Sequence, residues 1–288
     1  MAEHKHSSAQ EPESMNRIEV RLARTEAEVE ASLKLRYDIF YQENGAKKPE
    51  NLQDELDKDR YDDIAEHLIV IDKSIEKGSG GIVGTYRLLP QDIALKEGGF
   101  YTSGEYDITP LLNSGTRTLE LGRSCVLPEY RTRHIIQKLW AGISEYVTEN
   151  DIGLLFGCAS IPGTDIDKIS KQLAYLYHYH LAPEDIRPIA LENRYVDMHL
   201  HDKESIDKAR VFASLPPLFK GYLRIGSCVG DGAVIDHDFN TTDVCMILST
   251  QTVTDRYKKH YERRNKTSLP TGGNGRDSSR PPAQQSGT

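Results

Sequence analysis

The chain has 288 residues, of which 38% are hydrophobic, enough to fill the core of one large domain or of one domain with an added lobe. Its formal net charge of -8 argues against a nucleic-acid partner, because counterion release from phosphates requires a dense basic surface. No run approaches the roughly 18 apolar residues of a spanning helix, and the N-terminus lacks the apolar core of a signal peptide, so we expect a cytoplasmic protein.

The two ends of the chain differ in composition from its centre. Residues 1–16 and 266–288 are rich in Ser, Gly and Pro, and we expect them to be tails outside a single domain over 17–260. The four cysteines stand apart without a CxxC pair, which predicts reduced thiols rather than a zinc knuckle or a disulfide framework.

The first predicted elements are a strand and a helix. "IEVRLA", from Ile18, alternates apolar and polar residues, as a strand with one wet face does. Thr25 and Glu28 form a capping box, which predicts a helix from there to about Glu43. Arg36 lies on the apolar stripe of this helix, an unusual place for a solvated arginine.

Two strands, 66–74 and 80–90, follow with a turn-rich segment between them, which predicts an antiparallel hairpin. A further strand begins near Leu119, a helix spans 132–149, and the apolar run 153–163 is typical of a buried strand. Strand, helix and strand in this order predict a βαβ unit with parallel strands. The residues of the 132–149 helix expected to face inward are Ile135, Ile136, Leu139, Trp140, Ile143 and Val147. Helical patterns over 166–179 and 205–214 suggest a helical insertion or lobe at 164–220.

The strand "LELGRSCV" carries two charges that need an explanation. In a regular strand Glu120 and Arg123 point to opposite faces. A β-bulge at Gly122 would bring both side chains to one side and leave a backbone N–H unpaired near Ser124 or Cys125. An unpaired N–H beside a buried acid can bind a carbonyl oxygen.

These features resemble a known fold, that of the Gcn5-related N-acyltransferases (GNAT). The resemblance implies a mixed α/β, three-layer fold with a central mixed, splayed β-sheet flanked by helices. Four motifs are similar to those of acyl-homoserine-lactone synthases: "LRYDIFYQENG" to an R-x-x-x-F helix, "LDKDRYDD" to an acidic motif, "VGTYRLLP" to R-L-L-P and "ELGR" to E-x-S-R. The matching residues are Arg36, Phe40, Asp57, Asp59, Asp62, Arg87, Glu120 and Arg123.

A second resemblance covers residues 18–260. "LELGRSCVLPEYR", "LFGCASIPG" and "GDGAVIDHDFNTTDVC" resemble L-ornithine Nα-acyltransferases, the first enzymes of ornithine-lipid synthesis. This resemblance implies transfer of a 3-hydroxyacyl chain from acyl carrier protein to the α-amine of L-ornithine, forming lyso-ornithine lipid. The GNAT pyrophosphate loop appears here as 131–136 without glycine, and such a loop approaches coenzyme A poorly. We therefore expect no permanently bound cofactor, since phosphopantetheine arrives on the carrier protein.

The implied reaction is aminolysis of a thioester, which requires a base for the protonated amine. Glu120 is the first candidate, and the alternative is a buried Glu120–Arg123 pair that only fixes the strand. Cys125 is a candidate for acylation in a ping-pong scheme, although a small buried thiol is the preferred interpretation.

The resemblance also implies binding residues. Asp57, Asp59 and Asp62 would form an acidic wall for the δ-ammonium of ornithine. Arg36 and Arg87 would balance the charge of this wall, and Phe40 would be a further acceptor-site residue. The residues themselves suggest a further site, since Arg131 and Arg133 form a local cationic site where the following helix begins. We expect the acidic carrier protein and its phosphopantetheine to meet these arginines and Val126.

Other patterns favour plainer interpretations. His178 and His180 have metal-like spacing without a third ligand, so we expect no metal site. The stretch from Asp236 to Asp243 lacks the glycine and terminal glutamate of an EF-hand loop, and a polar turn or a further acceptor contact is preferred to calcium binding. The basic run 256–266 predicts peripheral contact with an anionic membrane at the inner surface.

Two other functions remain open from the sequence. One is an acyl-homoserine-lactone synthase, which would also close a lactone on S-adenosylmethionine. The other is a non-catalytic module that binds acyl carrier protein or lipid.

Overall fold

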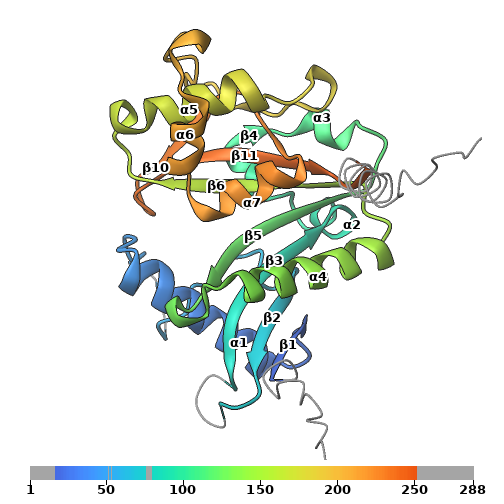
Figure 1. The fold of residues 1–288 in the computed structure, drawn as a ribbon. Coiled ribbons are helices and arrows are strands. Elements are labelled where there is room, and N and C mark those ends of the chain that lie inside the picture. Colours follow the sequence, from blue (N-terminus) through green and yellow to red (C-terminus); the bar gives the residue numbers. More distant parts are fainter. Residues whose placement is uncertain (1–16, 51, 53, 76–79, 252–288) are drawn as a thin grey trace, which may run out of the picture.

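The structure, a computed structural model, describes residues 17–50, 52, 54–75 and 80–251 (Figure 1). The expected tails at 1–16 and 266–288 and the basic run 256–266 lie outside these residues. Within the described residues, no helix combines the length and the apolar composition that crossing a bilayer requires.

One half of the central sheet is antiparallel. Its strands, in spatial order, are β1 (Ile18–Leu22), β2 (Glu66–Asp72), β3 (Ile82–Pro90) and β5 (Thr118–Val126). The predicted hairpin is confirmed, because β2 and β3 pair antiparallel.

The other half continues from β6 (Leu154–Pro162), which pairs parallel with β5 as the βαβ prediction requires. The next strands are β11 (Thr241–Ser249), β10 (Ala233–Asp236) and β8 (Tyr195–Val196), with β9 (Cys228–Val229) also on β11. A separate two-stranded sheet joins β4 (Tyr106–Asp107) to β7 (Ile189–Ala190).

The two halves separate between β5 and β6. Their pairing begins at Thr118 with Leu154 and ends at Glu120 with Phe156, after which the strands diverge, as Figure 1 shows toward its left side. At Gly157 the two strands still lie close together, since a Cβ there would lie 2.1 Å from the carbonyl oxygen of Leu121 in β5. Only glycine fits at this point, and the splayed central sheet expected from the sequence is confirmed.

Two helices cover the first half on opposite faces. The helix α1 (Glu26–Tyr37) continues as a π-helical segment (Asp38–Glu43). Its residues pack on Ile69 and Ile71, whereas α4 (Arg133–Glu149) packs on Leu68 and Val70. Because successive residues of β2 point to opposite faces, the sheet forms the middle of three layers.

The caps of these helices follow the sequence. The hydroxyl of Thr25 accepts the N–H of Glu28, and that of Thr132 accepts the N–H of Ile135. One expectation for α4 is wrong: Ile136 is 42% exposed. Tyr146 is buried in its place, because it lies on the same face as Ile135.

Helices also cover the second half. The helices α5 (Ile166–His180), α6 (Lys208–Ser214) and α7 (Pro217–Ile225) share one apolar cluster with β6 and β11. The short helices α2 (Gln91–Ala94) and α3 (Thr109–Leu112) lie with β4 on the opposite side, where Phe100 meets Phe156.

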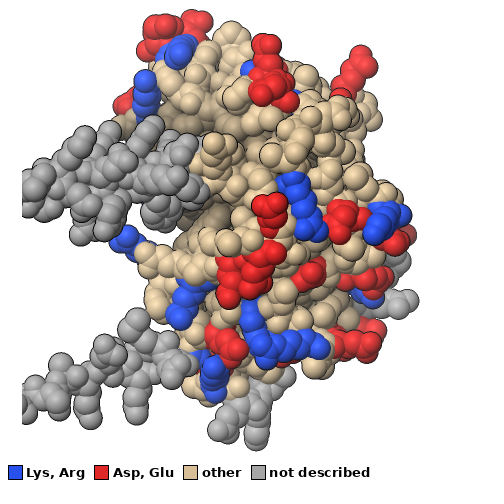
Figure 2. Space-filling model, turned by 90° about the vertical axis from the view of Figure 1, so that its right-hand side faces the viewer, with Lys and Arg blue, Asp and Glu red and all other residues tan. Residues whose placement is uncertain are grey.

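Surface charges form local pairs. On the face that Figure 2 shows, acidic and basic side chains are interspersed, mainly over the lower half. Examples of exposed pairs are Lys34 with Glu55 at 2.5 Å and Arg117 with Asp92 at 2.7 Å.

Candidate active site

A cavity of about 400 Å³ lies where β5 and β6 separate. Its apolar lining includes Leu121, Leu155, Phe156, Leu218, Met246 and Leu248. Its polar lining includes Arg87, Tyr101, Glu120, Arg123, Asp236 and Asp243. The cavity therefore offers an apolar surface for a hydrocarbon chain beside a set of charged groups.

A bulge in β5 shapes this cavity. Between Gly122 and Cys125, two residues of β5 lie opposite a single residue of β3. Arg123 lies in the bulge with a φ of +52°, a left-handed conformation that is costly for residues other than glycine. The predicted bulge is confirmed, one residue after Gly122, and it brings Arg123 to the cavity together with Glu120.

Glu120 is held by main-chain donors. Its side chain is buried, and its carboxylate accepts the N–H of Thr102 at 2.7 Å and that of Tyr101 at 3.0 Å. Burial raises the pKa of Glu120, and the hydrogen bonds of Thr102 oppose that rise. The alternative considered for Glu120, an ion pair with Arg123, is not formed, because Arg123 pairs with Asp57 and Asp59 instead.

Three arginines and three aspartates form a network next to the cavity. Its members are Arg36, Arg87, Arg123, Asp57, Asp59 and Asp62. Arg36, only 1% exposed, donates to Asp57 at 2.7 Å and to Asp62 at 2.6 Å. Burial alone would raise the pKa of Asp62, but Arg36 and Arg87 hold it far below its usual value. This network explains the arginine on the apolar stripe of α1.

The aspartates expected to form an acidic wall, Asp57, Asp59 and Asp62, lie in the network beside the cavity, where Arg36 and Arg87 balance them as expected. None of the three is among the residues that line the cavity, and their charge is compensated by the arginines of the network. Phe40, by contrast, does line the cavity, where its ring meets Phe239 edge-on at 5.9 Å.

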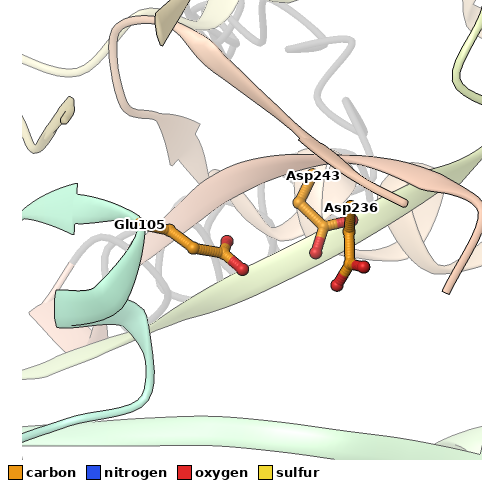
Figure 3. Close-up of side chains that lie close together, drawn as sticks. All are labelled: Glu105, Asp236 and Asp243. Carbon is orange, nitrogen blue, oxygen red and sulfur yellow. The ribbon is translucent and has the colours of Figure 1, made fainter. Parts of the chain in front are cut away.

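A second group of carboxylates lies nearby, and we call Glu105, Asp236 and Asp243 the acidic trio. Their side chains converge from the segment before β4, from the end of β10 and from β11 (Figure 3). The ligand oxygens of the trio lie within 4.8 Å of one another. No member forms an ion pair within the described part of the chain. Asp236 and Asp243 lay in a stretch for which a further acceptor contact was expected, whereas Glu105 gave no sequence signal.

The trio has unusual electrostatics. Glu105 and Asp243 are 4% and 5% exposed. Burial, with the nearby Asp243, raises the pKa of Glu105 to about 7. Burial raises the pKa of Asp243 to about 6, although hydrogen bonds from Ser160 and Thr241 oppose the rise. The thiol of Cys158 donates to Glu105 at 3.0 Å.

One polar cluster has donor atoms arranged as in a metal site. In the described residues, the acidic trio is the one group of His, Cys, Asp or Glu with donor atoms close enough for a metal ion, and its oxygens suit a hard cation. The rings of His178 and His180 instead contact the carbonyl of His201 and the hydroxyl of Tyr175.

Cys125 lies away from the cavity lining. It packs in the apolar cluster with Leu35 and Ile39, and burial raises the pKa of its thiol to about 12. A thiol that is buried and protonated is a poor nucleophile, so the structure does not support acylation of Cys125.

The start of α4 differs from the expected cationic pair. Arg131 forms a bidentate pair with Glu43 at 2.5 and 2.6 Å and donates to the carbonyl of Val126 at 3.0 Å. Arg133 begins α4 and is exposed. Glu43 therefore compensates one of the two positive charges, and Val126 contributes a main-chain oxygen with its side chain packed against the α4 cluster.

Comparisons with known proteins give the family. The acetyltransferase (GNAT) domain model matches residues 35–141. The L-ornithine N(alpha)-acyltransferase of Agrobacterium fabrum is 42% identical over 248 residues, 85% of this chain and 85% of the relative. That of Rhodobacter capsulatus is 42% identical over 85% of this chain and 95% of the relative. The solved CoA-dependent acyl-homoserine lactone synthase BjaI is 15% identical, with a TM-score of 0.44 over 83% of this chain and 88% of its own.

Identity at this level along most of both chains establishes kinship, and the GNAT match agrees with the splayed sheet that opens into the cavity. The chain belongs to the L-ornithine N(alpha)-acyltransferase family.

Proposed function

We propose that this chain transfers a 3-hydroxyacyl group from acyl carrier protein to the α-amine of L-ornithine, forming lyso-ornithine lipid. The observation that carries the proposal is the cavity between β5 and β6, in which an apolar lining adjoins charged groups. A fatty acyl chain needs the apolar lining, and an amino acid needs the charged groups. The names of the relatives supply the acceptor.

The reaction is aminolysis. The α-ammonium loses one proton, the amine nitrogen attacks the thioester carbonyl and a C–N bond forms. The C–S bond then breaks, the nitrogen loses a second proton, and the departing pantetheine thiolate takes up a proton to leave as the thiol. Glu120 is our candidate for the group that accepts the first proton, because it is buried, lines the cavity and has a pKa raised by burial. Arg123 lies beside it in the bulge, and its positive charge favours the oxyanion of the tetrahedral intermediate.

The donor is proposed to be a carrier-protein thioester rather than acyl coenzyme A. The turn from Arg131 to the first residues of α4 lacks the glycines that let a backbone approach a pyrophosphate. A carrier protein is acidic, and the exposed Arg133 at the start of α4 offers a positive charge for its docking.

The second candidate function is that of a homoserine-lactone synthase. It would have to close a lactone on S-adenosylmethionine as well as form the amide. The relatives that match this chain at 42% identity are named for ornithine acylation instead, and no observation favours the lactone.

Purified enzyme, 3-hydroxyacyl carrier protein and a panel of amino acids, followed by mass spectrometry, test the proposal. The expected product is the N-acyl derivative of ornithine. Release of an acyl-homoserine lactone in the presence of S-adenosylmethionine would favour the second candidate. Absence of any acyl amino acid from a folded enzyme would favour a non-catalytic binding module.

Peripheral membrane contact is proposed from the sequence alone. The basic run 256–266 could hold the cytoplasmic enzyme against anionic headgroups at about 1 kcal/mol for each cationic side chain near the surface. Sedimentation with anionic liposomes should pellet the full chain, in a salt-sensitive manner, more than a chain that ends at Thr254. Equal pelleting of the two chains would exclude this contact.

A further inference from the structure

We propose that the acidic trio binds the terminal ammonium of the acceptor and thereby selects a diamino acid over amino acids with neutral side chains. This inference rests on the proposed function, since it assigns the acceptor's side chain to residues of the same cavity. It replaces Asp57, Asp59 and Asp62 in the role of acidic wall.

The trio lacks the positive partners that the buried aspartates of the network have. Asp57 and Asp62 both bind Arg36, so their charge is neutralised within the fold. Glu105 and Asp243 are as deeply buried, yet no lysine or arginine of the described chain lies within ion-pair distance of either. Carboxylates gathered in a poorly solvated place repel one another, and a cation that joins them relieves the repulsion.

More distant charges do not replace such a cation. Arg123 lowers the pKa of Asp243 and Arg194 lowers that of Glu105, but each is the weakest of the named influences on its carboxyl. Asp236 acts in the opposite direction on both carboxyls. The environment that these groups create favours an added positive charge.

The position of the trio fits an acceptor that must reach the thioester. Asp236 and Asp243 line the cavity between β5 and β6, whereas Glu105 lines a second, more open hollow. The two hollows share Tyr101, Asp236 and Phe239 as lining residues. A small amino acid at this junction contacts the trio at one end and leaves its other end in the cavity with Glu120 and Arg123.

The chemistry of the trio matches an ammonium group. An alkylammonium has three N–H donors and no acceptor, and each carboxylate offers free acceptor positions. The oxygens of the trio lie within 4.8 Å of one another, so a single nitrogen between them can donate to all three. Figure 3 shows the three side chains directed toward a common point.

The test compares L-ornithine with L-norvaline, which has the same carbon chain without the δ-amine. Steady-state kinetics with one acylated carrier protein give kcat/KM for both acceptors in the wild type, Asp243→Asn and Glu105→Gln. We expect each substitution to lower kcat/KM for ornithine by about 30-fold or more, as for loss of one partner of a buried charge pair, and to leave the value for norvaline nearly unchanged. Asp92→Asn, which affects only the exposed pair with Arg117, serves as the control.

An unchanged ornithine-to-norvaline ratio in the folded variants would overturn the inference. Loss of wild-type activity with EDTA, restored by Mg²⁺ or Ca²⁺, would also overturn it, because the trio would then hold a metal. If Asp243→Asn does not fold, Asp236→Asn, at a partly exposed position, takes its place. The criterion is again the ratio of kcat/KM for ornithine to that for norvaline. The proposed function fails separately, if the wild type does not acylate ornithine at all.

Discussion

The carboxylate of Glu120 accepts the backbone N–H of Thr102 at 2.7 Å, and this bond ties β5 to the segment that leads to Glu105. A second bond, from the N–H of Tyr101 at 3.0 Å, strengthens the tie. Glu120 therefore combines two roles. It lines the cavity as a candidate base, and it positions the segment that contributes Glu105 to the acidic trio.

Substitution of Glu120 by Gln separates these roles. If Glu120 accepts the amine proton, kcat should fall by about 10²-fold or more, because general-base catalysis contributes about 10²–10⁴. The melting temperature should fall as well, since an amide can accept only one of the two N–H groups, and an unsatisfied buried donor costs about 1–3 kcal/mol. Rates at saturating substrates and thermal melts measure both effects. Near-normal turnover in a less stable protein would leave Glu120 with the positioning role alone.

Arg36 should be essential for stability. Arg36→Met removes the charge that holds Asp57 and Asp62, and loss of one partner from a buried ion pair costs about 3–5 kcal/mol. Lys168→Met, at an exposed pair with Asp165, should cost far less stability, because water screens the pair. Urea unfolding of both variants at pH 7 measures the difference. Equal losses would mean that the network contributes no more than a surface pair.

Stability should depend on pH through the acidic trio. Burial raises the pKa of Glu105 to about 7 in the folded chain, so the folded state binds this proton more tightly than the unfolded state. The stabilising effect is complete below the ordinary pKa of a glutamate, about 4.3, and is lost as pH rises toward 7. Without acceptor, Glu105→Gln should therefore melt at a higher temperature than the wild type at pH 8.

The difference should shrink toward pH 4, where the carboxyl is protonated in both states. Asp243, with a pKa raised to about 6, should show the same loss of stability with rising pH over a lower pH range. That range begins near the ordinary pKa of an aspartate, about 3.9. Melting curves between pH 4 and 8 test both residues. A Glu105→Gln variant that is less stable than the wild type at pH 8 would show that the trio is already compensated.

The features that were predicted most accurately from the sequence are those that depend on a few neighbouring residues. The cap at Thr25, the hairpin of β2 and β3 and the bulge near Gly122 depend on neighbouring residues, and each was found where it was expected. The motifs also identified the residues of the arginine–aspartate network. Arg36 and Arg87 balance the aspartates as expected. The turn of Arg123 toward Asp57 and Asp59 was not predictable, because it depends on how the bulge places this side chain in three dimensions.

The acidic trio shows the limit most clearly. Glu105 lies in an ordinary polar stretch, and its approach to Asp243 depends on the fold of the segment before β4 and on the bonds to Glu120. No local pattern records such a contact between distant parts of a chain. The expectation for Ile136 failed for a related reason, since helical periodicity alone does not fix how wide the buried stripe of α4 is.

The start of α4 yields the last prediction, which concerns the carrier protein. Arg131 is bound to Glu43 through both ends of its guanidinium, whereas Arg133 is exposed and has no ion pair among the residues that the structure describes. An acidic partner should therefore interact mainly with Arg133. We expect Arg133→Ala to raise KM for the acylated carrier protein more than Arg131→Ala does, with KM for ornithine nearly constant.

Salt provides the check on this assignment. Interactions between exposed charges are screened at moderate ionic strength, so added NaCl should raise KM for the carrier protein more in the wild type than in Arg133→Ala. Glu43→Gln is the matched control: it frees the charge of Arg131 and should lower that KM at low salt. If all three variants use the carrier protein as the wild type does across the salt series, docking takes place away from this turn, and the positive charges there serve only the fold.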